Sequence, residues 1–382
     1  MRPTLLQPWP GLPEALRHVH ASAHAKHHGT TDSAVATVPD MTPIRSERLT
    51  LRLMTHTDVD TYVAYRSDPV TLELLETHVP PIAERIHAEV DAAASLGGLA
   101  EDHWVRLAVT LAGEEEMIGD VGAGIKNGGG VVDIGYVFRP EFRGRGYASE
   151  AVRALVDHVI DAHSIHRIEA VLSPLNMASM RVLESIGMSF ESITKLSCCL
   201  DGVWEDDLHY AMTADDRRAW QARDRHAPDE IELVAVDADN ADEFARLRTH
   251  YSQEAYVAPM LRSYRDALFA ESVDGVVTVP WMRGIVADGA AAGFMMTSTT
   301  YGLQDGWYLW RLLIDRIHQR RGIGRRALDL LIEELRSKDV LRLYTSCGEG
   351  PGSPRPFYER LGFVDTGRLV DEHETELVLR IA

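Results

Sequence analysis

Cysteine, lysine and long apolar runs are all scarce in this chain of 382 residues. Its three cysteines, Cys198, Cys199 and Cys347, have no metal-ligand spacing, so the sequence predicts neither a disulfide framework nor a zinc site. No apolar run reaches the roughly 18 to 20 residues of a membrane helix, and the first residues lack the apolar stretch of a secretory signal. We therefore expect a cytoplasmic protein that does not span a membrane.

Basic residues are outnumbered by acidic ones, 39 to 58, which gives a formal net charge of −19. This charge repels nucleic acid and anionic membranes, so we expect neither as a partner, whereas a cationic small molecule is compatible with it. Arginine far exceeds lysine, as is typical of a bacterial genome rich in G and C. With 45% hydrophobic residues the chain can build real cores, and its length predicts two domains.

The chain divides into four stretches. Residues 1–43 have no sustained periodicity and are interpreted as an extension, followed by a first domain (44–213), a charged linker (214–229) and a second domain (230–382). Imidazole is a common metal ligand, but no carboxylate or cysteine stands at a useful spacing from the histidines of the extension. We assign no metal to them; they are His18, His20, His24, His27 and His28.

The two predicted domains show the same order of elements. Each begins with a strand, at 48–54 and at 231–236, and continues with helices, at 56–68 and about 81–96 in the first and near 239–253 and 259–270 in the second. Three strands, a glycine turn, an amphipathic helix, a strand, a helix and two closing strands follow in both. A repeat of this length implies two copies of one fold.

A glycine-rich string lies between a strand and a helix in each half. Both strings fit Gln/Arg-x-x-Gly-x-Gly/Ala, and they are Arg143-Gly144-Arg145-Gly146-Tyr147-Ala148 and Gln319-Arg320-Arg321-Gly322-Ile323-Gly324. In that position main-chain N–H groups and the positive helix end converge on an anion, which predicts a pyrophosphate cradle. The alternative for one such string is a tight turn, but recurrence favours the cradle. Neither a dinucleotide-binding nor a Walker motif is present.

Both halves resemble the GCN5-related N-acetyltransferase (GNAT) family, whose hallmark is this glycine motif. In the first half RSERLTLRLMTHTDVD, DIGYVFRPEFRGRGYASEAV and N-x-x-S-x-R-V-L-E-x-x-G-M resemble the ribosomal-protein N-terminal acetyltransferases. In the second half AAGFMM, YLWRLLIDRIHQRRGIGRRAL and PFYERLGF resemble the spermine/spermidine acetyltransferase-like branch. The resemblance implies tandem α/β (α+β) folds, each a mixed, mostly antiparallel sheet of about seven strands flanked by about four helices.

The resemblance also implies acetyl-CoA as the cofactor, bound in a V-shaped opening between the fourth and fifth strands. The residues that would hold it in the first half are Phe138, Arg143, Gly144, Arg145, Gly146, Tyr147, Ala148 and Asn176. Those in the second half are Leu313, Ile314, Gln319, Arg320, Arg321, Gly322, Ile323, Gly324 and Arg325. An amine then attacks directly, without an acyl-enzyme.

Attack by an amine calls for a base. Asp133, before the Ile-Gly-Tyr of the fourth strand, is the candidate in the first half, with a solvent-facing carboxylate as the plainer alternative. In the second half Trp310 or Arg311 replaces the family's frequent glutamate, which puts a direct base there in doubt. Trp310 is a candidate for an acceptor pocket or for the core, and Glu374 and Glu376 are candidates for steering a cationic acceptor.

The leaving thiolate calls for a proton donor. Tyr358, in PRPFYERLGF, matches the family's helix-four tyrosine, commonly the general acid. The matching helix of the first half carries Ser179, a weaker acid that is expected to hydrogen-bond the sulfur.

These observations predict an N-acetyltransferase that acts on the primary amine of a small molecule (polyamine, aminoglycoside or amino-acid-like) or of a peptide N-terminus. One alternative is that one half catalyses while the other is a degenerate acetyl-CoA-binding or structural module; another is a non-catalytic acyl-CoA sensor. A duplicated chain is expected to be a monomeric pseudo-dimer or a homodimer.

Overall fold

The computed structural model describes residues 37–39 and 43–381, apart from 76–78, 102, 129, 163–164, 201, 271, 274, 302–304 and 372. These residues belong to one compact unit. The histidine cluster of the predicted extension lies outside the described residues. No helix of the described part is long and apolar enough to cross a membrane.

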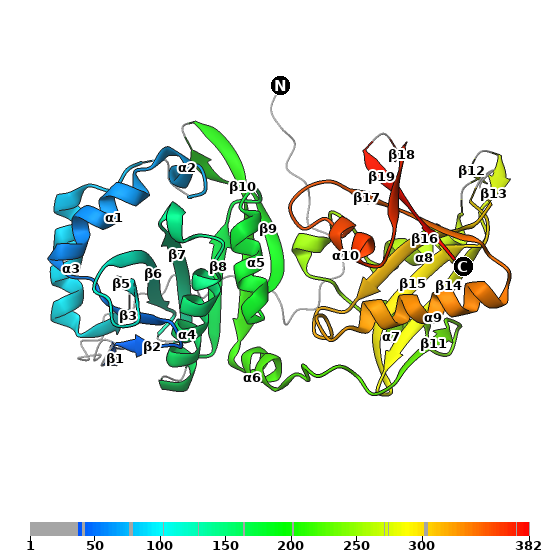
Figure 1. The fold of residues 1–382 in the computed structure, drawn as a ribbon. Helices are drawn as coiled ribbons and strands as arrows, with labels where there is room; N and C mark the ends of the chain where they lie inside the picture. Colours follow the sequence, from blue (N-terminus) through cyan, green and yellow to red (C-terminus); the bar gives the residue numbers. More distant parts are fainter. Residues whose placement is uncertain are drawn as a thin grey trace, which may run out of the picture. The chain divides into compact units, whose positions relative to one another are not determined.

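The first half contains an eight-stranded sheet in which only the β7–β8 pair is parallel. Figure 1 shows its strands in blue to green. In spatial order they are β2 (Ile44–Arg45), β3 (Leu49–Leu53), β5 (Trp104–Leu111), β6 (Met117–Lys126), β7 (Val131–Phe138), β8 (Arg167–Leu172), β10 (Val203–Thr213) and β9 (Ser189–Leu200). The prediction of a mixed, mostly antiparallel sheet is confirmed.

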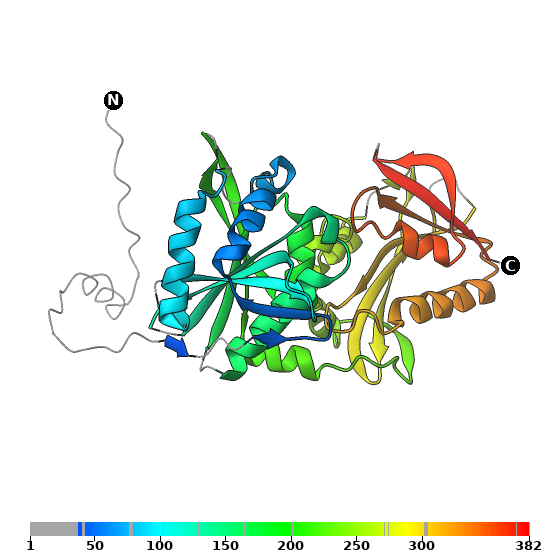
Figure 2. The ribbon, with the colours of Figure 1, turned by 60° about the vertical axis from the view of Figure 1, so that its left-hand side comes forward.

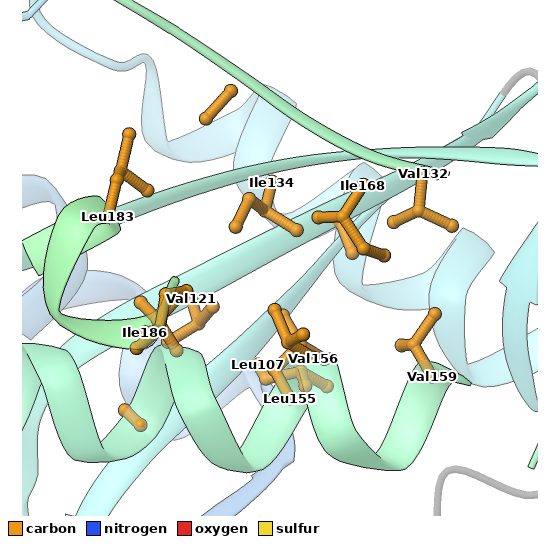
Figure 3. Packing of buried hydrophobic residues seen from close by; sticks show 14 of the residues in the cluster. Leu107, Val121, Val132, Ile134, Leu155, Val156, Val159, Ile168, Leu183 and Ile186 are labelled. Carbon is orange, nitrogen blue, oxygen red and sulfur yellow. The ribbon is translucent and has the colours of Figure 1, made fainter. Parts of the chain in front are cut away.

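Helices cover both faces of this sheet because its strands alternate two sets of apolar side chains. On one face Leu155 and Val156 of α4 (Tyr147–Ala162) pack with Leu107 of β5, together with α5 (Met177–Ile186) (Figure 3). On the other face the next residue of β5, Ala108, joins the core of α1 (Val59–Arg66) and α3 (Ala83–Leu96). Figure 2 shows α1 and α3 beside the strands, in blue and cyan.

The second half contains a seven-stranded sheet of the same kind, drawn in yellow to red in Figure 1. In spatial order its strands are β11 (Ile231–Ala235), β14 (Pro280–Ala287), β15 (Ala290–Ser298), β16 (Trp307–Ile314), β17 (Arg342–Gly348), β19 (Glu374–Arg380) and β18 (Val364–Val370). One core joins the sheet to α9 (Ile323–Ser337) and α10 (Arg355–Arg360), and another joins it to α7 (Ala241–Ala245) and α8 (Met260–Leu268).

Each sheet separates at its one parallel pair. β7 pairs with β8 only over Val131–Asp133, and β16 pairs with β17 only over Trp307 and Tyr308. Beyond these residues the later part of β7 and of β16 has no partner strand on that side. The separation exposes main-chain N–H and C=O groups, which must find other partners.

One local prediction was wrong. A helix was expected near 239–253, but α7 ends at Ala245 and only a 3-10 turn, Tyr251–Gln253, follows. Between them the main chain of Arg248 is held by the end of β16, since its N–H donates to Asp315 (2.8 Å) and its C=O accepts from the N–H of Arg316 (2.8 Å). In the predicted extension, residues Thr37–Pro39 form a strand, β1, paired with β4 (Gly98–Ala100).

The predicted linker begins with a helix, α6 (Ala214–Ala222), which starts at a capping box of Thr213 and Asp216. Trp220 of this helix lies against Gly187, the residue that ends α5 with a φ of 100°. A side chain at Gly187 would overlap the indole ring, so this position requires glycine both for its backbone angle and for space.

Candidate active sites

The first glycine loop turns the chain from β7 into α4. Gly144 and Gly146 have φ angles of 74° and 80°, a region that favours glycine. Arg48, which directly precedes β3, contacts the loop through its side chain. Its guanidinium donates to the carbonyl of Arg145 (3.2 Å) and forms an ion pair with Glu150 of α4 (2.6 Å). Arg48 was not singled out from the sequence, because its partners lie about 100 residues away.

Arg143 is used within the fold. Its Nε donates to the carbonyl of Phe138 (2.8 Å), its Nη2 to Thr71 (2.7 Å), and its N–H to the carbonyl of Pro140 (3.2 Å). The predicted cradle therefore depends on the residues that follow Arg143, where α4 begins and a helix leaves its first N–H groups without intrahelical partners.

A cavity of about 380 Å³ lies between this loop, β7 and α5. Asn176, the N-cap of α5, lines it: its side-chain oxygen accepts from the N–H of Ser179 (3.0 Å), and its amide donates to Leu74 (3.1 Å). The predicted residues on its wall are Phe138, Arg143, Gly144, Gly146, Tyr147, Ala148, Asn176 and Ser179. Arg145 is exposed beside it. The structure thus brings the first set of candidates together.

Ser179 also lines a second cavity, of about 350 Å³, on the other side of the opened strand pair. Tyr136 of β7 lines both cavities and donates from its hydroxyl to the carbonyl of Ser179 (3.1 Å). Burial raises the pKa of Tyr136 well above its usual range, so this donor stays protonated. Asp133 lines the second cavity and forms an ion pair with Lys126. Asp133 and Ser179 therefore face one space.

Trp104 forms a wall of this second cavity that was not predicted. Its indole lies over Gly122, Gly124 and Gly135, and a side chain at Gly122 would overlap the ring. Gly122 and Gly135 are directly paired on β6 and β7. Glycines in register on neighbouring strands indicate that a large side chain lies over them, and that signal was available in the sequence only once the register was known.

The second glycine loop has the same form. Arg320 has a φ of 64° and Gly322, the N-cap of α9, a φ of 80°. Arg321 is buried, and its guanidinium is tied to the carbonyl of His226 (2.8 Å) and the carboxylate of Asp224 (2.6 Å). Gln319 donates to the carbonyl of Ile314 (3.0 Å). Arg321, like Arg143, therefore anchors its loop through its side chain.

A cavity of about 590 Å³ opens between this loop, β16, β17 and α10. The predicted residues on its wall are Trp310, Ile314, Gln319, Arg320, Gly322, Ile323, Gly324, Arg325 and Tyr358. Leu313 is buried in the core on the other face of the sheet. Trp310 stands beside Arg311, whose guanidinium pairs with Asp266 (2.8 Å).

Tyr358 is buried, and burial raises the pKa of its hydroxyl well above its usual range, outweighing the hydrogen bond with Thr345, which lowers it. Ser346 lines the same cavity and its hydroxyl donates to Glu374. A hydrogen-bond path therefore runs from the cavity to that carboxylate. Glu376 is buried elsewhere, where it accepts from Tyr301 (2.9 Å). Within the described residues no group of histidine, cysteine or carboxylate side chains is arranged as a metal site.

Comparison with known proteins assigns both halves to the same kind of domain. Residues 48–189 match the model "Acetyltransferase (GNAT) domain" and residues 241–363 match "Acetyltransferase (GNAT) family". The uncharacterized N-acetyltransferase YnaD of Bacillus subtilis is 30% identical over 169 residues, which is 44% of this chain and 95% of YnaD. The [ribosomal protein uS5]-alanine N-acetyltransferase of Escherichia coli is 31% identical over 83 residues, 22% of this chain and 43% of that protein. A solved GNAT-family acetyltransferase from Bacillus anthracis is 28% identical with a TM-score of 0.41, covering 46% of this chain and 99% of that one.

Proposed function

The chain belongs to the GCN5-related N-acetyltransferase (GNAT) family, and from that premise we propose that it transfers acetyl groups from acetyl-CoA to a primary amine at the opening in each half. One observation carries the proposal. In both sheets the parallel strand pair parts beside a glycine loop, and cavities lie at the exposed strand.

The residues present fit this cofactor. A side chain at Gly144 or Gly322 would meet nothing within 4 Å, so the main chain of each loop is open to a phosphate group. Gly144, Gly146 and the start of α4 would hold it in the first half, and Gly322 with the start of α9 in the second. When bound, acetyl-CoA supplies an acetyl thioester, which an amine can attack directly.

The amine has to lose a proton first. An ammonium group with a pKa of about 10.4 is mostly charged at neutral pH, and deprotonation there costs about 4.6 kcal/mol. We propose that the carboxylate of Asp133 accepts this proton in the first half, directly or through water, because Asp133 lines the cavity on the acceptor side. Trp104 in the same wall offers a ring face to a cation.

Ser179 lies at the junction of the two cavities of the first half. Its main-chain N–H and C=O are both used, by Asn176 and Tyr136, so the turn that presents the hydroxyl is fixed on two sides. We assign to that hydroxyl the hydrogen bond to the departing sulfur.

In the second half we propose different side chains for accepting the proton of the amine and for donating one to the sulfur. The hydroxyl of Ser346 would accept a proton from the amine while passing its own to the carboxylate of Glu374, to which it already donates. The hydroxyl of Tyr358 would donate to the departing sulfur, and its raised pKa keeps it protonated at neutral pH. This route needs no carboxylate on β16.

The acceptor is proposed as a small-molecule amine or a peptide N-terminus. The similarity to the ribosomal-protein alanine N-acetyltransferase of Escherichia coli supports a peptide acceptor, whereas nothing in the cavity walls singles out one small amine. Both halves match acetyltransferase models, which does not favour a purely structural half or a sensor.

A thiol-release assay with acetyl-CoA and a panel of amines tests the proposal. The panel contains a polyamine, an aminoglycoside, an amino acid and a peptide beginning with alanine. We expect turnover with at least one of them. Removing a general base or acid costs about 100-fold or more in kcat, so Asp133→Asn and Glu374→Gln should each remove most of the activity of their own half.

The conservative variants Tyr358→Phe and Ser179→Ala complete the set, and each is measured with the other half silenced by a loop variant. Lys126→Ala is the matched control for Asp133, because it removes the ion-pair partner and keeps the carboxylate. If acetyl-CoA binds but all these variants turn over like the wild type, the side-chain assignments are wrong. If no acetyl-CoA binds, the proposed function is wrong.

A further inference from the structure

A cavity of about 600 Å³ lies between the two halves, and we call it the inter-half cavity. The halves touch directly beside it: the carboxylate of Glu184 accepts from the N–H (2.9 Å) and hydroxyl (2.5 Å) of Ser252, and Phe190 stacks on Tyr251 with ring centroids 3.9 Å apart. Its walls therefore come from both halves. The basic side chains on them are Arg153, Arg181, Arg223, Arg316, Arg320 and His250.

These five guanidinium groups lack the ion-pair partners that arginines in this chain usually have, although Arg223 donates to the carbonyl of Trp220 and lies over its ring. Among the described ion pairs, none involves any of the five, although the chain as a whole carries 58 acidic residues. Glu184 is the one carboxylate on the wall, and its oxygens are already taken by Ser252 and by the hydroxyl of Tyr210 (3.1 Å). The cavity thus concentrates positive charge in a protein whose net charge is strongly negative.

Burial and the surrounding positive charges lower the pKa of two residues on the cavity wall. Burial and the neighbouring Arg316, Arg320 and Arg223 lower the pKa of His250 to about 4. Burial and, in decreasing order, Arg225, Arg217 and Arg153 lower the pKa of Arg223 to about 10. A bound anion would offset the repulsion between these positive charges.

The inter-half cavity shares walls with the cofactor-side cavity of each half. Ser149 and Arg181 line it together with the first, and Gln319 and Arg320 line it together with the second. Arg181 also touches Gly352 across the boundary, where a side chain would overlap its guanidinium. An anion in the inter-half cavity would therefore lie next to both glycine loops.

We propose that the inter-half cavity is a binding site for a phosphate-bearing anion, held by arginines from both halves. Guanidinium groups match phosphate because they donate two parallel hydrogen bonds and stay charged. A phosphate dianion or diphosphate offers enough charge and oxygen atoms for several arginines, whereas a single carboxylate does not. Its source is either a phosphate of coenzyme A bound in a neighbouring cavity or a separate phosphorylated molecule.

Inorganic pyrophosphate is the first probe, titrated into the full chain at fixed ionic strength by calorimetry and by thermal unfolding. We expect a rise in Tm and, besides any pyrophosphate bound at the two glycine loops, one further site that depends on the arginines of the cavity. In the double variant Arg153→Ala/Arg316→Ala binding should weaken by tenfold or more, since charged hydrogen bonds are lost. Arg380→Ala, an exposed arginine on β19, is the control and should bind as the wild type does. Without ligand the double variant should keep its Tm, because neither guanidinium has an ion-pair partner.

A comparison of coenzyme A with 3′-dephospho-coenzyme A separates the two sources. If the cofactor's own phosphate fills the cavity, the wild type prefers coenzyme A by tenfold or more, and the double variant loses that preference. If a separate molecule fills it, the two cofactors bind equally and pyrophosphate still binds to cofactor-saturated protein. If pyrophosphate finds no further site in cofactor-saturated protein and the two cofactors are bound equally, the site does not exist. The pyrophosphate titration requires no acetyl transfer, so it is informative even if the proposed function fails.

Discussion

A negative charge placed on either glycine loop should weaken cofactor binding in that half alone. Gly146 and Gly322 are suitable positions because each precedes its helix and both have a φ of 80°. Replacement by aspartate or asparagine adds nearly the same volume at the same backbone angle, with a strain of about 1–2 kcal/mol in either case. The difference between the two variants at one position therefore reports charge.

The size of that difference follows from the surroundings of each glycine. A carboxylate about 5 Å from a phosphate charge is repelled by roughly 1 kcal/mol in water and roughly 3 kcal/mol at an effective dielectric constant of 20. This corresponds to a loss of affinity of about 5- to 150-fold. At Gly322 an added Cβ would meet nothing within 4 Å, whereas at Gly146 it would lie 3.5 Å from the guanidinium of Arg48, which would offset part of the added charge. We expect the larger loss for Gly322→Asp.

Calorimetric titration with acetyl-CoA measures this loss. The wild type should show two sites, Gly146→Asp and Gly322→Asp should each retain one, and the asparagine variants should keep both with modest weakening. Equal affinities for aspartate and asparagine variants at both positions would mean that no phosphate approaches the loops, and the assignment of both cradles would be wrong. A loss of both sites in one single variant would contradict their independence.

Three further predictions concern stability. Asp120→Ala should lower the free energy of unfolding by about 3–5 kcal/mol in urea titration, because it leaves Arg66 partly buried without its carboxylate partner at 2.6 Å. Burial disfavours ionisation of Asp58, but hydrogen bonds from Arg52 and Thr55 outweigh burial and lower the pKa of its carboxyl group. Asp58→Asn should therefore be less stable than the wild type at pH 7. This difference in unfolding free energy should shrink as the pH falls below about 4, where the wild-type carboxylate becomes protonated. Gly284→Ala should lower the free energy of unfolding by about 1–3 kcal/mol in the same assay, because a side chain there would overlap the ring of Phe244. For each of the three variants, an unfolding midpoint equal to that of the wild type at pH 7 would refute the contact on which the prediction rests.

The fold was predictable wherever one short stretch of sequence decides the structure. The alternation of Leu49 and Leu51 fixes the buried face of β3, and the apolar positions of α9 fall on one side, including Leu331 and Leu335. Gly187 ends α5 as expected, with a φ of 100°. These features depend on residues within a few positions of one another, so a single sequence contains them in full.

The helix expected near 239–253 does not form because residues far away in the sequence decide the structure there. The composition of 246–250 does not forbid a helix, but Arg248 bonds with Asp315 and Arg316, almost 70 positions away, and these bonds hold its main chain outside a helix. A tertiary contact of this kind overrides a weak local preference.

The candidate sites divide in the same way. Main-chain features such as the left-handed angle at Gly322 could be anticipated from glycine, because few other residues adopt it. The partners of side chains could not be anticipated in this way. They depend on strand register, which the sequence does not state; examples are Trp104, which lies over the paired glycines of β6 and β7, and Ser346, which donates to Glu374. The sequence therefore located the loops and part of the cavity walls, such as Asp133 and Tyr358, but not Trp104 or Ser346.

The two halves share the form of the glycine loop but not the side chains that we propose to move protons. The cofactor is expected to contact mainly backbone atoms of the loops, whereas the proposed proton carriers are Asp133 with Ser179 in one half and Glu374 through Ser346 with Tyr358 in the other. Because main-chain N–H groups would bind the phosphates, other side chains of the loop can change without loss of cofactor binding as long as the glycines remain. The halves should therefore bind acetyl-CoA with similar affinity while accepting different amines, because the acceptor meets only the side chains that differ.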